Sequence, residues 1–430
     1  MQGDRSMSCV NRMSVSYAIF GSGISAQGAR RLALSNGSKV VLFDESGKGD
    51  QIDFRSEDLS KFDGFIFSPG FAADHPWRVL VEASGLPCLS ELAFAARYWK
   101  GRIIGVTGTN GKSTVTALLE RALKISKLTS LAAGNIGHSF SEAVLSDSNI
   151  LEAYVVLEIS SFQAELVDGL VLDALIWTNL SEDHLDRYAT IGDYYNAKAQ
   201  LLQCLKTMQS CVIGPQVASW IRNMDEEFIP CILEEKSIPP AYELCQNSVF
   251  RRSPYSENFL LVTKLWSLMN QSPPSLVEAA NSFSLAPHRL NKVAEFGGVH
   301  FWDDSKATNF HATLAALQSF DDPIVWIGGG QPKGGDIQAF IKKASEHADV
   351  VVLYGEIADY MVQFFDDSRP LVYFYQRFEE AVQAAAKIGA SMPGANVLLS
   401  PGFSSFDQFK SYEERGKCFT RIVLSLKSTQ

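Results

Sequence analysis

Short apolar runs alternate with helical patterns at both ends of this 430-residue chain. Near the N-terminus, strand-like runs occupy 16–20, 39–43 and 65–67, and a helical stretch covers 30–34. In the last third the alternation is regular, with apolar-periodic helices such as 378–386 between the strand-like runs. These later runs are 299–302, 324–327, 350–353, 371–375 and 397–399. Such alternation is typical of doubly wound, mostly parallel sheets, so the pattern predicts α/β domains.

A middle segment begins at the strand-like run 102–107. Two more apolar runs, 153–157 and 173–177, end in polar clusters, whereas 205–285 is harder to read. A chain of this length is too long for one ordinary core, so division into several domains is expected. We therefore predict three α/β domains, at 1–99, 100–287 and 288–430.

Composition and charge narrow the class of protein. The net charge of −10 argues against a general nucleic-acid binder, whose affinity depends on neutralising phosphates, but it is compatible with a small anionic ligand. No apolar run approaches the roughly 18 residues of a membrane span, and residues 1–15 lack the apolar stretch of a signal peptide. The seven cysteines are scattered and include no C-x-x-C pair, which indicates neither a disulfide framework nor a zinc site. We expect a cytoplasmic protein without membrane insertion.

A glycine-rich loop follows the first strand-like run. It reads Gly21-Ser-Gly23-Ile-Ser-Ala-Gln-Gly28, and Asp44 ends the second run. This resembles a dinucleotide-binding fingerprint, except that the third glycine is displaced by one position. The loop is compatible with either a nucleotide-binding site or a plain tight turn.

The strongest single motif is Gly105-Val-Thr-Gly108-Thr-Asn-Gly111-Lys112-Ser113-Thr114, between a strand and a helical pattern. Glycines allow backbone N–H groups to surround a phosphate, and the helix N-terminus adds favourable partial charge. Lys112 is placed to reach the β- and γ-phosphates, and the Ser113 hydroxyl to reach Mg²⁺. The glycine spacing departs from a strict Walker pattern, but the strand–loop–helix context predicts a phosphate loop.

Polar clusters follow the next two strands of the middle segment. Glu158 opens one cluster, and His184 lies in the other, which runs from Asn179 to Arg187. Carboxyl ends of parallel strands meet at one sheet edge, where α/β folds bind ligands. Glu158 suits Mg²⁺, which takes oxygen ligands, and the position of His184 beside a nucleotide loop favours function over a structural role. For Lys198, on the helical stretch 194–205, periodicity alone favours a solvated surface lysine.

Seven ordered motifs together resemble the Mur ligase family over essentially the whole chain, most weakly at 205–285. They are Gly108-Thr-Asn-Gly-Lys-Ser-Thr114, Glu158-Ile-Ser-Ser-Phe162, Asn179 to Arg187, Ala197-Lys198, His288-Arg289-Leu290, Asp303-Asp304-Ser305-Lys306-Ala307-Thr308-Asn309 and Ser400-Pro401 to Gly416. The earlier motifs are common to all Mur ligases and to folylpolyglutamate synthases. The last two look like the D-glutamate-adding branch.

The resemblance implies an N-terminal Rossmann-like domain for the UDP-substrate, a central P-loop-type ATPase domain and a C-terminal Rossmann-like domain that closes with D-glutamate. It implies an ATP- and Mg²⁺-dependent ligase that adds D-glutamate to UDP-N-acetylmuramoyl-L-alanine through an acyl phosphate. ADP and phosphate are released, in peptidoglycan precursor synthesis. The small-molecule substrates are the expected partners, nucleic acid is not, and a monomer is expected.

The resemblance also assigns residues to roles. ATP would be bound by Gly108, Thr109, Asn110, Gly111, Lys112, Ser113, Thr114, Asn258, Arg289 and Asp304. The UDP-substrate would meet Ile24, Ser25, Asp44, Ser68, Gly70, Asn135 and Ser160. D-glutamate would be held by Lys306, Thr308, Lys333, Ser405 and Tyr412. Ser113, Glu158, His184 and Lys198 as a carbamate would ligate metal, and Lys112, Glu158, His184 and Lys198 would be catalytic.

The chain departs from the family pattern at three places. On the adenine side only Asn258 of the usual motif remains, Pro332 replaces an aspartate before Lys333, and Gly402-Phe403-Ser404 replaces Ala-Cys-Ala. None of these changes removes a charged group on which the chemistry depends. Two alternatives remain within the enzyme class, a sibling ligase for another amino acid and a folylpolyglutamate synthase. From another class, a nucleotide-dependent switch protein that lost catalysis would lack Glu158, His184 or Lys198, and all three are present.

Overall fold

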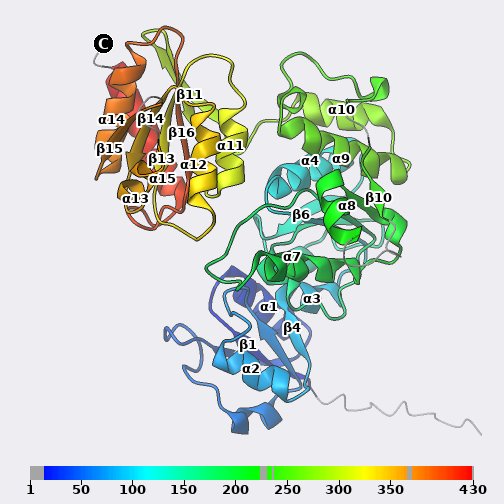
Figure 1. Cartoon of the computed structure of the whole chain (residues 1–430). Helices are drawn as coiled ribbons and strands as arrows, with labels where there is room; N and C mark the ends of the chain where they lie inside the picture. Colours follow the sequence, from blue (N-terminus) through cyan, green and yellow to red (C-terminus); the bar gives the residue numbers. More distant parts are fainter. Residues whose placement is uncertain (1–13, 223–229, 235–236, 366–369, 429–430) are drawn as a thin grey trace, which may run out of the picture. The chain divides into compact units, whose positions relative to one another are not determined.

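The computed structural model describes residues 14–222, 230–234, 237–365 and 370–428. Their strands form three sheets, one of four strands and two of six (Figure 1). The chain divides into two compact units. The first unit comprises the chain up to Gly105, Leu128–Leu175 and Ala197–Thr207. The second comprises Val106–Lys127, Ile176–Asn196 and the chain from Met208 onward.

The first sheet is parallel, with the order β2-β1-β3-β4. Its elements are β1 (Ser16–Phe20), α1 (Ile24–Ser35), β2 (Lys39–Phe43), the 3-10 helix η1 (Ser56–Lys61), β3 (Gly64–Phe67), α2 (Pro76–Ala83), β4 (Cys88–Ser90) and α3 (Glu91–Ala96). The three predicted strands are confirmed. Aromatic residues fill this core, where Phe20 stacks on Phe67 with ring centroids 4.0 Å apart. Strands that are apolar at nearly every position are typical of such parallel sheets.

The second sheet has the order β10-β9-β8-β5-β7-β6. Its strands are β5 (Arg102–Thr107), β6 (Ser130–Gly134), β7 (Tyr154–Glu158), β8 (Ala174–Trp177), β9 (Cys211–Ile213) and β10 (Cys231–Ile232). Its helices are α4 (Lys112–Ile125), α5 (Phe140–Leu145), α6 (Ser161–Ala164), α7 (Ile191–Ala199), α8 (Pro215–Arg222), α9 (Tyr255–Leu268) and α10 (Pro273–Asn281). Four 3-10 turns complete it, η2 (Gln200–Leu202), η3 (Met208–Ser210), η4 (Pro240–Tyr242) and η5 (Val249–Arg251).

One sequence-based expectation for this region needs correction, and one gap in the sequence interpretation has an explanation. The helix expected over 194–205 is α7, which ends at Ala199 and passes into the 3-10 turn η2. The stretch 205–285 was hard to read because its strands have only two or three residues and its helices are separated by irregular turns. Strands this short give no alternation for a sequence pattern to detect.

The third sheet has the order β11-β12-β16-β13-β14-β15, and every neighbouring pair is parallel except β11 with β12. Its strands are β11 (Asn291–Phe296), β12 (Val299–Asp303), β13 (Ile324–Gly329), β14 (Val350–Tyr354), β15 (Leu371–Tyr375) and β16 (Asn396–Gly402). Its helices are α11 (Phe310–Leu317), α12 (Ile337–Ser345), α13 (Ala358–Val362), α14 (Phe378–Gly389) and α15 (Tyr412–Lys427). The five strands predicted here are confirmed.

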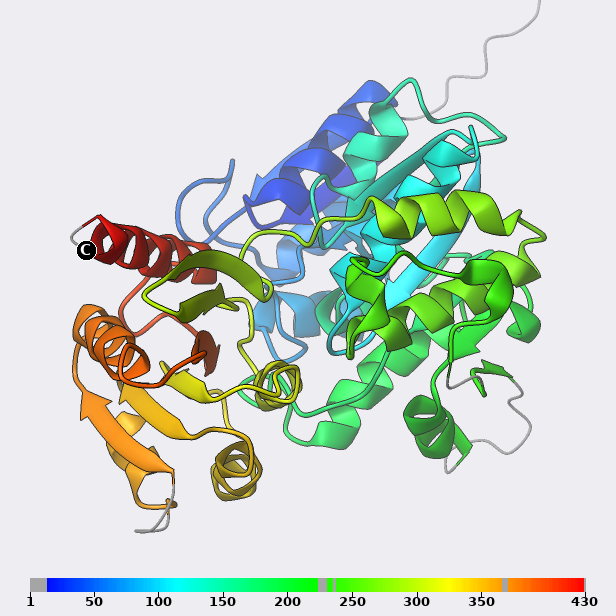
Figure 2. The same ribbon diagram turned by 90° about the horizontal axis from the view of Figure 1, so that it is seen from above.

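Helices cover both faces of the third sheet. One apolar core contains residues of α14 and α15, and a second contains residues of α11, α12 and α13. Figures 1 and 2 show α14 and α15 on one side of the strands and α11 and α12 on the other. This doubly wound arrangement brings the loops after β12, β13, β14 and β16 to the carboxyl edge of the sheet, where α/β folds bind ligands.

Within the described residues, no helix has both the length and the apolar character to cross a membrane.

Candidate active site

The loop between β5 and α4 is held in one conformation by its neighbours. Gly108 and Gly111 have positive φ angles of 137° and 84°. A Cβ at Gly108 would lie 1.9 Å from Thr178 Oγ1, and one at Gly111 would lie 2.4 Å from Asn258 Oδ1. Only glycine fits such positions. The loop therefore follows the course that the sequence predicts for a phosphate loop, with Asn258 packed against it.

Lys112 is the first residue of α4. Its ammonium donates hydrogen bonds to the carbonyl oxygens of Gly108 at 2.9 Å and Thr109 at 2.7 Å. The charge therefore lies inside the loop that is predicted to receive the phosphates. Because α4 begins here, the positive end of its helix dipole adds to the potential at this point.

Two residues that flank strands of the third sheet, Arg289 before β11 and Asn309 after β12, reach this loop within the second compact unit. Arg289 Nη2 donates to the hydroxyl of Ser113 at 2.9 Å. Asn110 and Asn309 exchange amide hydrogen bonds, at 3.3 Å and 3.1 Å. Arg289 and the loop were predicted to bind ATP together, and the structure brings them into contact. His311 Nδ1 also lies 3.2 Å from the Asn110 amide nitrogen.

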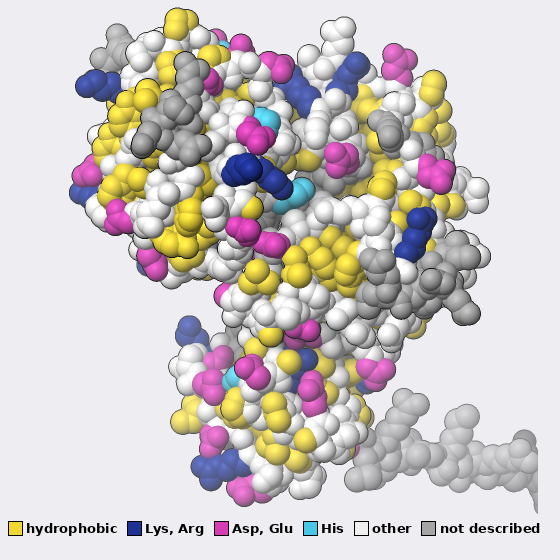
Figure 3. All heavy atoms as spheres, in the orientation of Figure 1, with side chains coloured by type: hydrophobic (Ala, Val, Ile, Leu, Met, Phe, Trp, Pro, Cys, Tyr) yellow, Lys and Arg dark blue, Asp and Glu magenta, His cyan; other side chains and the backbone are white. Residues whose placement is uncertain are grey.

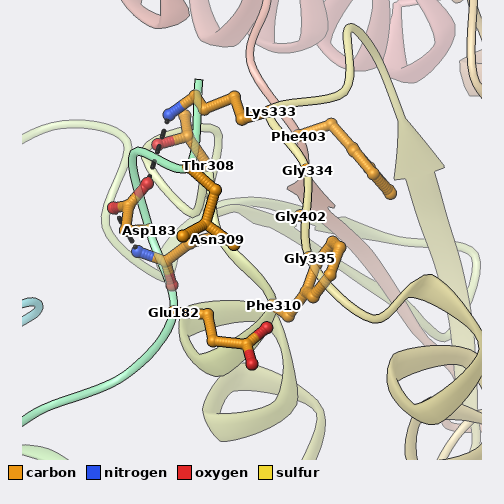
Figure 4. Close-up of a pocket in the computed structure, with 11 residues that line it drawn as sticks. Glu182, Asp183, Thr308, Asn309, Phe310, Lys333, Gly334, Gly335, Gly402 and Phe403 are labelled. Carbon is orange, nitrogen blue, oxygen red and sulfur yellow. Dashed lines mark hydrogen bonds and ion pairs between the residues drawn. The ribbon is translucent and has the colours of Figure 1, made fainter. Parts of the chain in front are cut away.

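Asp183 links the phosphate loop to the predicted D-glutamate residues. Its carboxylate accepts a hydrogen bond from Asn309 Nδ2 at 3.1 Å, and Lys333 Nζ lies 3.7 Å from its other oxygen. Figure 4 shows both side chains reaching Asp183. Burial acts to raise the pKa of Asp183, but the ammonium of Lys333, together with His184, outweighs it and holds the pKa below its usual range. Asp183 is therefore ionised at neutral pH.

A pocket opens beside this ion pair. It is lined by Glu182, Asp183, Leu185, Thr308, Asn309, Phe310, Lys333, Gly334, Gly335, Gly402 and Phe403. Thr308 and Lys333 are two of the five residues predicted to hold D-glutamate. In the space-filling view, basic, acidic and histidine side chains lie close together near the middle of the upper half of the face shown (Figure 3). The lining thus combines the cation Lys333, which is paired with Asp183, a second carboxylate on Glu182, and the hydroxyl and amide groups of Thr308 and Asn309.

The other predicted D-glutamate residues do not line this pocket. Lys306 Nζ lies 3.7 Å from the ring centroid of Tyr412, a cation–π contact that holds both side chains together. Ser405 is buried in the loop that follows β16. The five residues are thus divided between the pocket, the contact of Lys306 with Tyr412 at the start of α15, and the loop after β16.

Asp304, predicted to contact ATP, holds the segment that carries Arg289. It accepts hydrogen bonds from the Leu290 N–H at 3.0 Å and from the Ser400 hydroxyl at 2.9 Å. Burial raises the pKa of Asp304 to about 7. The neighbouring Asp303 pairs with His288 at 2.6 Å. These contacts fix residues 288–290, where two non-glycine residues have positive φ angles.

Residues predicted to bind the UDP-substrate lie in the first compact unit. Gly21, Asp44 and Ser68 follow β1, β2 and β3 at the carboxyl edge of the first sheet. A Cβ at Gly21 would lie 2.7 Å from Ser68 Oγ, so the backbone approaches that hydroxyl closely. Hydrogen bonds from Ser22 and Ser46 lower the pKa of Asp44. Ile24 and Gly70 are exposed, and Ser25 is half-buried.

The first unit also contains Glu158, Asn135 and Ser160. Asn135 Nδ2 donates to Glu158 Oε1 at 2.9 Å, and Ser160 caps α6 by accepting from the Gln163 N–H at 3.2 Å. Glu158 is buried, and its other oxygen, Oε2, has no hydrogen-bond partner among the described residues. A buried carboxylate oxygen without a partner suits a bound cation or a polar substrate group.

The surface position that periodicity favoured for Lys198 is wrong. Its side chain is only 1% exposed, and Tyr194, one helical turn earlier, is 2% exposed. The spacing of four residues puts both on one helix face, and an aromatic residue at that spacing was the available signal. Among the predicted metal ligands, Glu158 and Lys198 belong to the first unit, and Ser113 and His184 to the second. His184 Nε2 lies 3.8 Å from Asp183.

Sequence reasoning assigned no role to Asp183, Asn309 or Arg415, although all three lie in the motifs that carried the resemblance. Asp183 and Asn309 make the contacts described above, and Arg415 is fully buried beneath the loops after β12 and β16. Burial and pairing of polar residues depend on distant segments, which no local pattern reveals.

Comparisons with known proteins agree on one family. Residues 106–235 match the Mur ligase middle domain, and residues 288–403 match the Mur ligase glutamate ligase domain. The chain is 33% identical over 401 residues to a UDP-N-acetylmuramoylalanine–D-glutamate ligase from Gloeothece citriformis, covering 88% of each chain. It is 32% identical to a ligase of the same name from Pelotomaculum thermopropionicum, covering 95% of this chain and 97% of that one.

Solved structures share the fold at low identity. The MurF ligase of Thermotoga maritima in complex with ADP superposes with a TM-score of 0.61 at 16% identity, covering 96% of both chains. The UDP-N-acetylmuramate-alanine ligase of the same organism gives a TM-score of 0.58 at 18% identity, covering 97% of this chain and all of that one. These likenesses show the α/β fold of the chain.

Proposed function

The chain belongs to the Mur ligase family, and we propose that it is an ATP-dependent ligase that adds D-glutamate to UDP-N-acetylmuramoyl-L-alanine. The observation that supports this best is the bridge from the phosphate loop through Asn309 and Asp183 to Lys333. It joins a nucleotide loop to a pocket with a cation for an amino-acid carboxylate. The products are ADP, phosphate and an amide, and the reaction serves peptidoglycan synthesis.

The chemistry requires two anions to meet. A carboxylate is a poor electrophile, so it is first converted to an acyl phosphate by attack on the γ-phosphate, with the reacting atoms about 3–3.5 Å apart. Lys112 and Arg289, which lie at the phosphate loop, would neutralise charge on the transferring group. The amine of D-glutamate then attacks the acyl carbon, and phosphate leaves.

Mg²⁺, when bound, would offset the repulsion between the carboxylate and the γ-phosphate. The unpartnered oxygen of Glu158 suits such a cation. We propose that Lys198 is carbamylated, because a carbamate replaces a buried ammonium near the cation with anionic oxygens. Ser113 and His184 are proposed as the remaining ligands.

Each of the three proposed domains has one task. Residues 1–99 would hold the UDP-substrate through Ile24, Ser25, Asp44, Ser68 and Gly70, together with Asn135 and Ser160 of the next domain. Residues 100–287 would hold ATP, and residues 288–430 would bring D-glutamate. We further propose that the protein acts in the cytoplasm as a monomer.

Phosphate release tests the proposal directly. The purified protein is assayed with ATP, Mg²⁺, UDP-N-acetylmuramoyl-L-alanine and, in turn, D-glutamate, L-glutamate, D-aspartate, meso-diaminopimelate and L-alanine. We expect D-glutamate to be preferred by a factor of about 10⁴ over neutral amino acids, because these leave buried polar groups unpaired. Comparable kcat/KM for L-alanine or meso-diaminopimelate would assign a sibling ligase instead. Turnover of a folate substrate with L-glutamate would assign a folylpolyglutamate synthase.

A further inference from the structure

Arg415 is a buried cation in the first turn of α15. Its side chain is 0% exposed and is among the largest fully buried side chains of the described residues. Arginine is rarely buried completely unless a carboxylate neutralises it. No carboxylate lies within ion-pair distance of Arg415 in the described part of the chain.

Neutral oxygen atoms satisfy the guanidinium instead. Nε donates to the Ser305 hydroxyl at 3.0 Å, and Nη2 donates to the Ser305 carbonyl at 2.8 Å and to the Phe403 carbonyl at 3.2 Å. Nη1 donates to the Tyr354 hydroxyl at 3.1 Å and to the carbonyls of Phe403 and Ser404 at 3.2 Å. Burial raises the pKa of Tyr354 to about 12, so its hydroxyl remains neutral. These bonds remove the cost of unpaired donors but leave the positive charge in place.

The acceptors belong to the loops that carry the predicted D-glutamate residues. Ser305 precedes Lys306, and its hydroxyl donates to the Tyr412 carbonyl at 2.8 Å. Phe403 and Ser404 precede Ser405. One side chain therefore fixes the loop after β12, the loop after β16 and the start of α15.

The acidic residues of the same region make other contacts, although Asp407 Oδ1 is buried without a hydrogen-bond partner among the described residues. Asp303 pairs with His288 and accepts from the Ser305 N–H at 3.0 Å. Asp304 accepts from Ser400 and Leu290. Asp407 accepts from the Glu356 N–H at 3.3 Å and, like Arg415, lies close enough to Tyr354 to affect its pKa. Asp407 therefore offsets the charge of Arg415 only in part, because the two side chains are not paired.

We propose that Arg415 is a positioning residue that sets the affinity of the site for an anionic amino acid, by holding the two loops and by supplying a fixed positive charge. It cannot bind the substrate itself, because its donors are occupied by protein oxygens. In a region of low dielectric constant a fixed charge acts on an anion beyond contact distance. The inference rests on the proposed function, since it assumes that the dicarboxylate D-glutamate is the ligand of these loops.

The test separates the KM for D-glutamate from the KM for ATP. Arg415→Met removes the charge at similar length, and Arg415→Lys keeps the charge but loses the planar fork. Arg421→Met is the matched control, because Arg421 is exposed on the same helix and its loss changes the net charge equally. The three variants are compared with the wild-type full chain. Phosphate release gives kcat and each KM, and thermal unfolding gives Tm.

We expect Arg415→Met to raise the KM for D-glutamate at least about tenfold, which corresponds to about 1.4 kcal/mol, while the KM for ATP stays within about twofold. Arg415→Lys should recover most of this loss, and Arg421→Met should match the wild type. A purely structural role would instead lower Tm or kcat without a selective change in the KM for D-glutamate, and that result would overturn the inference.

If Arg415→Met does not fold, Arg415→Lys decides. In a folded Arg415→Lys enzyme, a KM for D-glutamate within about threefold of wild type supports the role of the charge, and a larger rise with an unchanged KM for ATP assigns the effect to the loops that the fork holds. An equal rise in the KM for ATP would overturn the inference. Wild-type protein that releases no phosphate with D-glutamate would instead refute the proposed function, before any variant is compared.

Discussion

Replacing Asn309 by aspartate tests whether the bridge from the phosphate loop to Lys333 is needed for turnover. Asn309 caps α11 by accepting from the Ala312 N–H at 2.9 Å, and aspartate caps helices equally well. The new carboxylate oxygen would replace an amide nitrogen that lies 3.1 Å from Asp183 Oδ2. The substitution therefore keeps the helix cap. It makes the contact with Asp183 repulsive and also removes the hydrogen bond that Nδ2 donates to Asn110 Oδ1 at 3.1 Å.

The magnitude follows from that distance. Two unit charges 3.1 Å apart repel by about 5 kcal/mol at an effective dielectric constant of about 20. Relaxation and partial protonation would leave about 2–3 kcal/mol, which corresponds to about a 30- to 150-fold fall in kcat/KM for ATP. The helix cap is retained, so any fall in Tm reports the same repulsion in the folded state and not unwinding of α11.

The pH dependence of kcat/KM tests whether the deficit of Asn309→Asp comes from charge repulsion. In the wild type, Lys333 and the other partners of Asp183 hold its pKa low, so this carboxylate stays ionised at neutral pH. In Asn309→Asp the two carboxylates share a proton, and the pKa of the pair is raised. The deficit in kcat/KM should therefore shrink as the pH falls from about 8 to about 6. Asn309→Ser, which keeps a cap without adding charge, should show a smaller deficit that does not vary with pH.

The assay is kcat/KM for ATP at several pH values, with Tm measured on the same samples. Activity of Asn309→Asp within about threefold of wild type at pH 8 would show that the bridge is not used in turnover. A deficit that grows as the pH falls would refute the electrostatic reasoning.

Three further predictions concern single side chains. Lys112→Ala should lower kcat below about a tenth of wild type at saturating ATP, and a larger residual rate would remove Lys112 from the machinery. Lys198→Ala should be inactive if its carbamate is a metal ligand, and wild-type kcat at physiological Mg²⁺ would exclude that role. Glu91 accepts from the Ser141 N–H at 2.5 Å, and burial raises its pKa to about 7. Its ionisation therefore lowers stability as the pH rises from about 4.5 through 7. Glu91→Gln should accordingly raise Tm more at pH 8 than at pH 5, and an equal change at both pH values would contradict this.

Much of the fold could be predicted from the sequence because long parallel strands are apolar at nearly every position. The runs 16–20 and 371–375 match β1 and β15 residue for residue. β9 and β10 could not be predicted, because two or three residues form no period. The antiparallel strand β11 was missed because half-buried positions alternate in it with exposed ones and weaken the apolar run.

The candidate site was predictable where the backbone determines it. Gly108 and Gly111 predict a loop with positive φ angles, and both residues have such angles in the structure. Pairing between distant segments was not predictable. Asn110 meets Asn309 across 199 positions of sequence, and Arg415 meets Ser305 across 110. For Lys198, periodicity alone favoured the surface, and the aromatic Tyr194 one turn earlier was the only sequence signal for its burial.

The place of Arg415 in chain order has a consequence for biosynthesis. All the strands of the third sheet precede α15, so a nascent chain can pair β12, β13, β14 and β16 before this helix has been synthesised. The loops that carry Lys306 and Ser405 would then be present without the guanidinium that ties them together. A translation product that stops before α15 would also lack Phe419, Ile422 and Val423 of the apolar core, so the loops that carry the amino-acid residues would have neither their tie nor their packing.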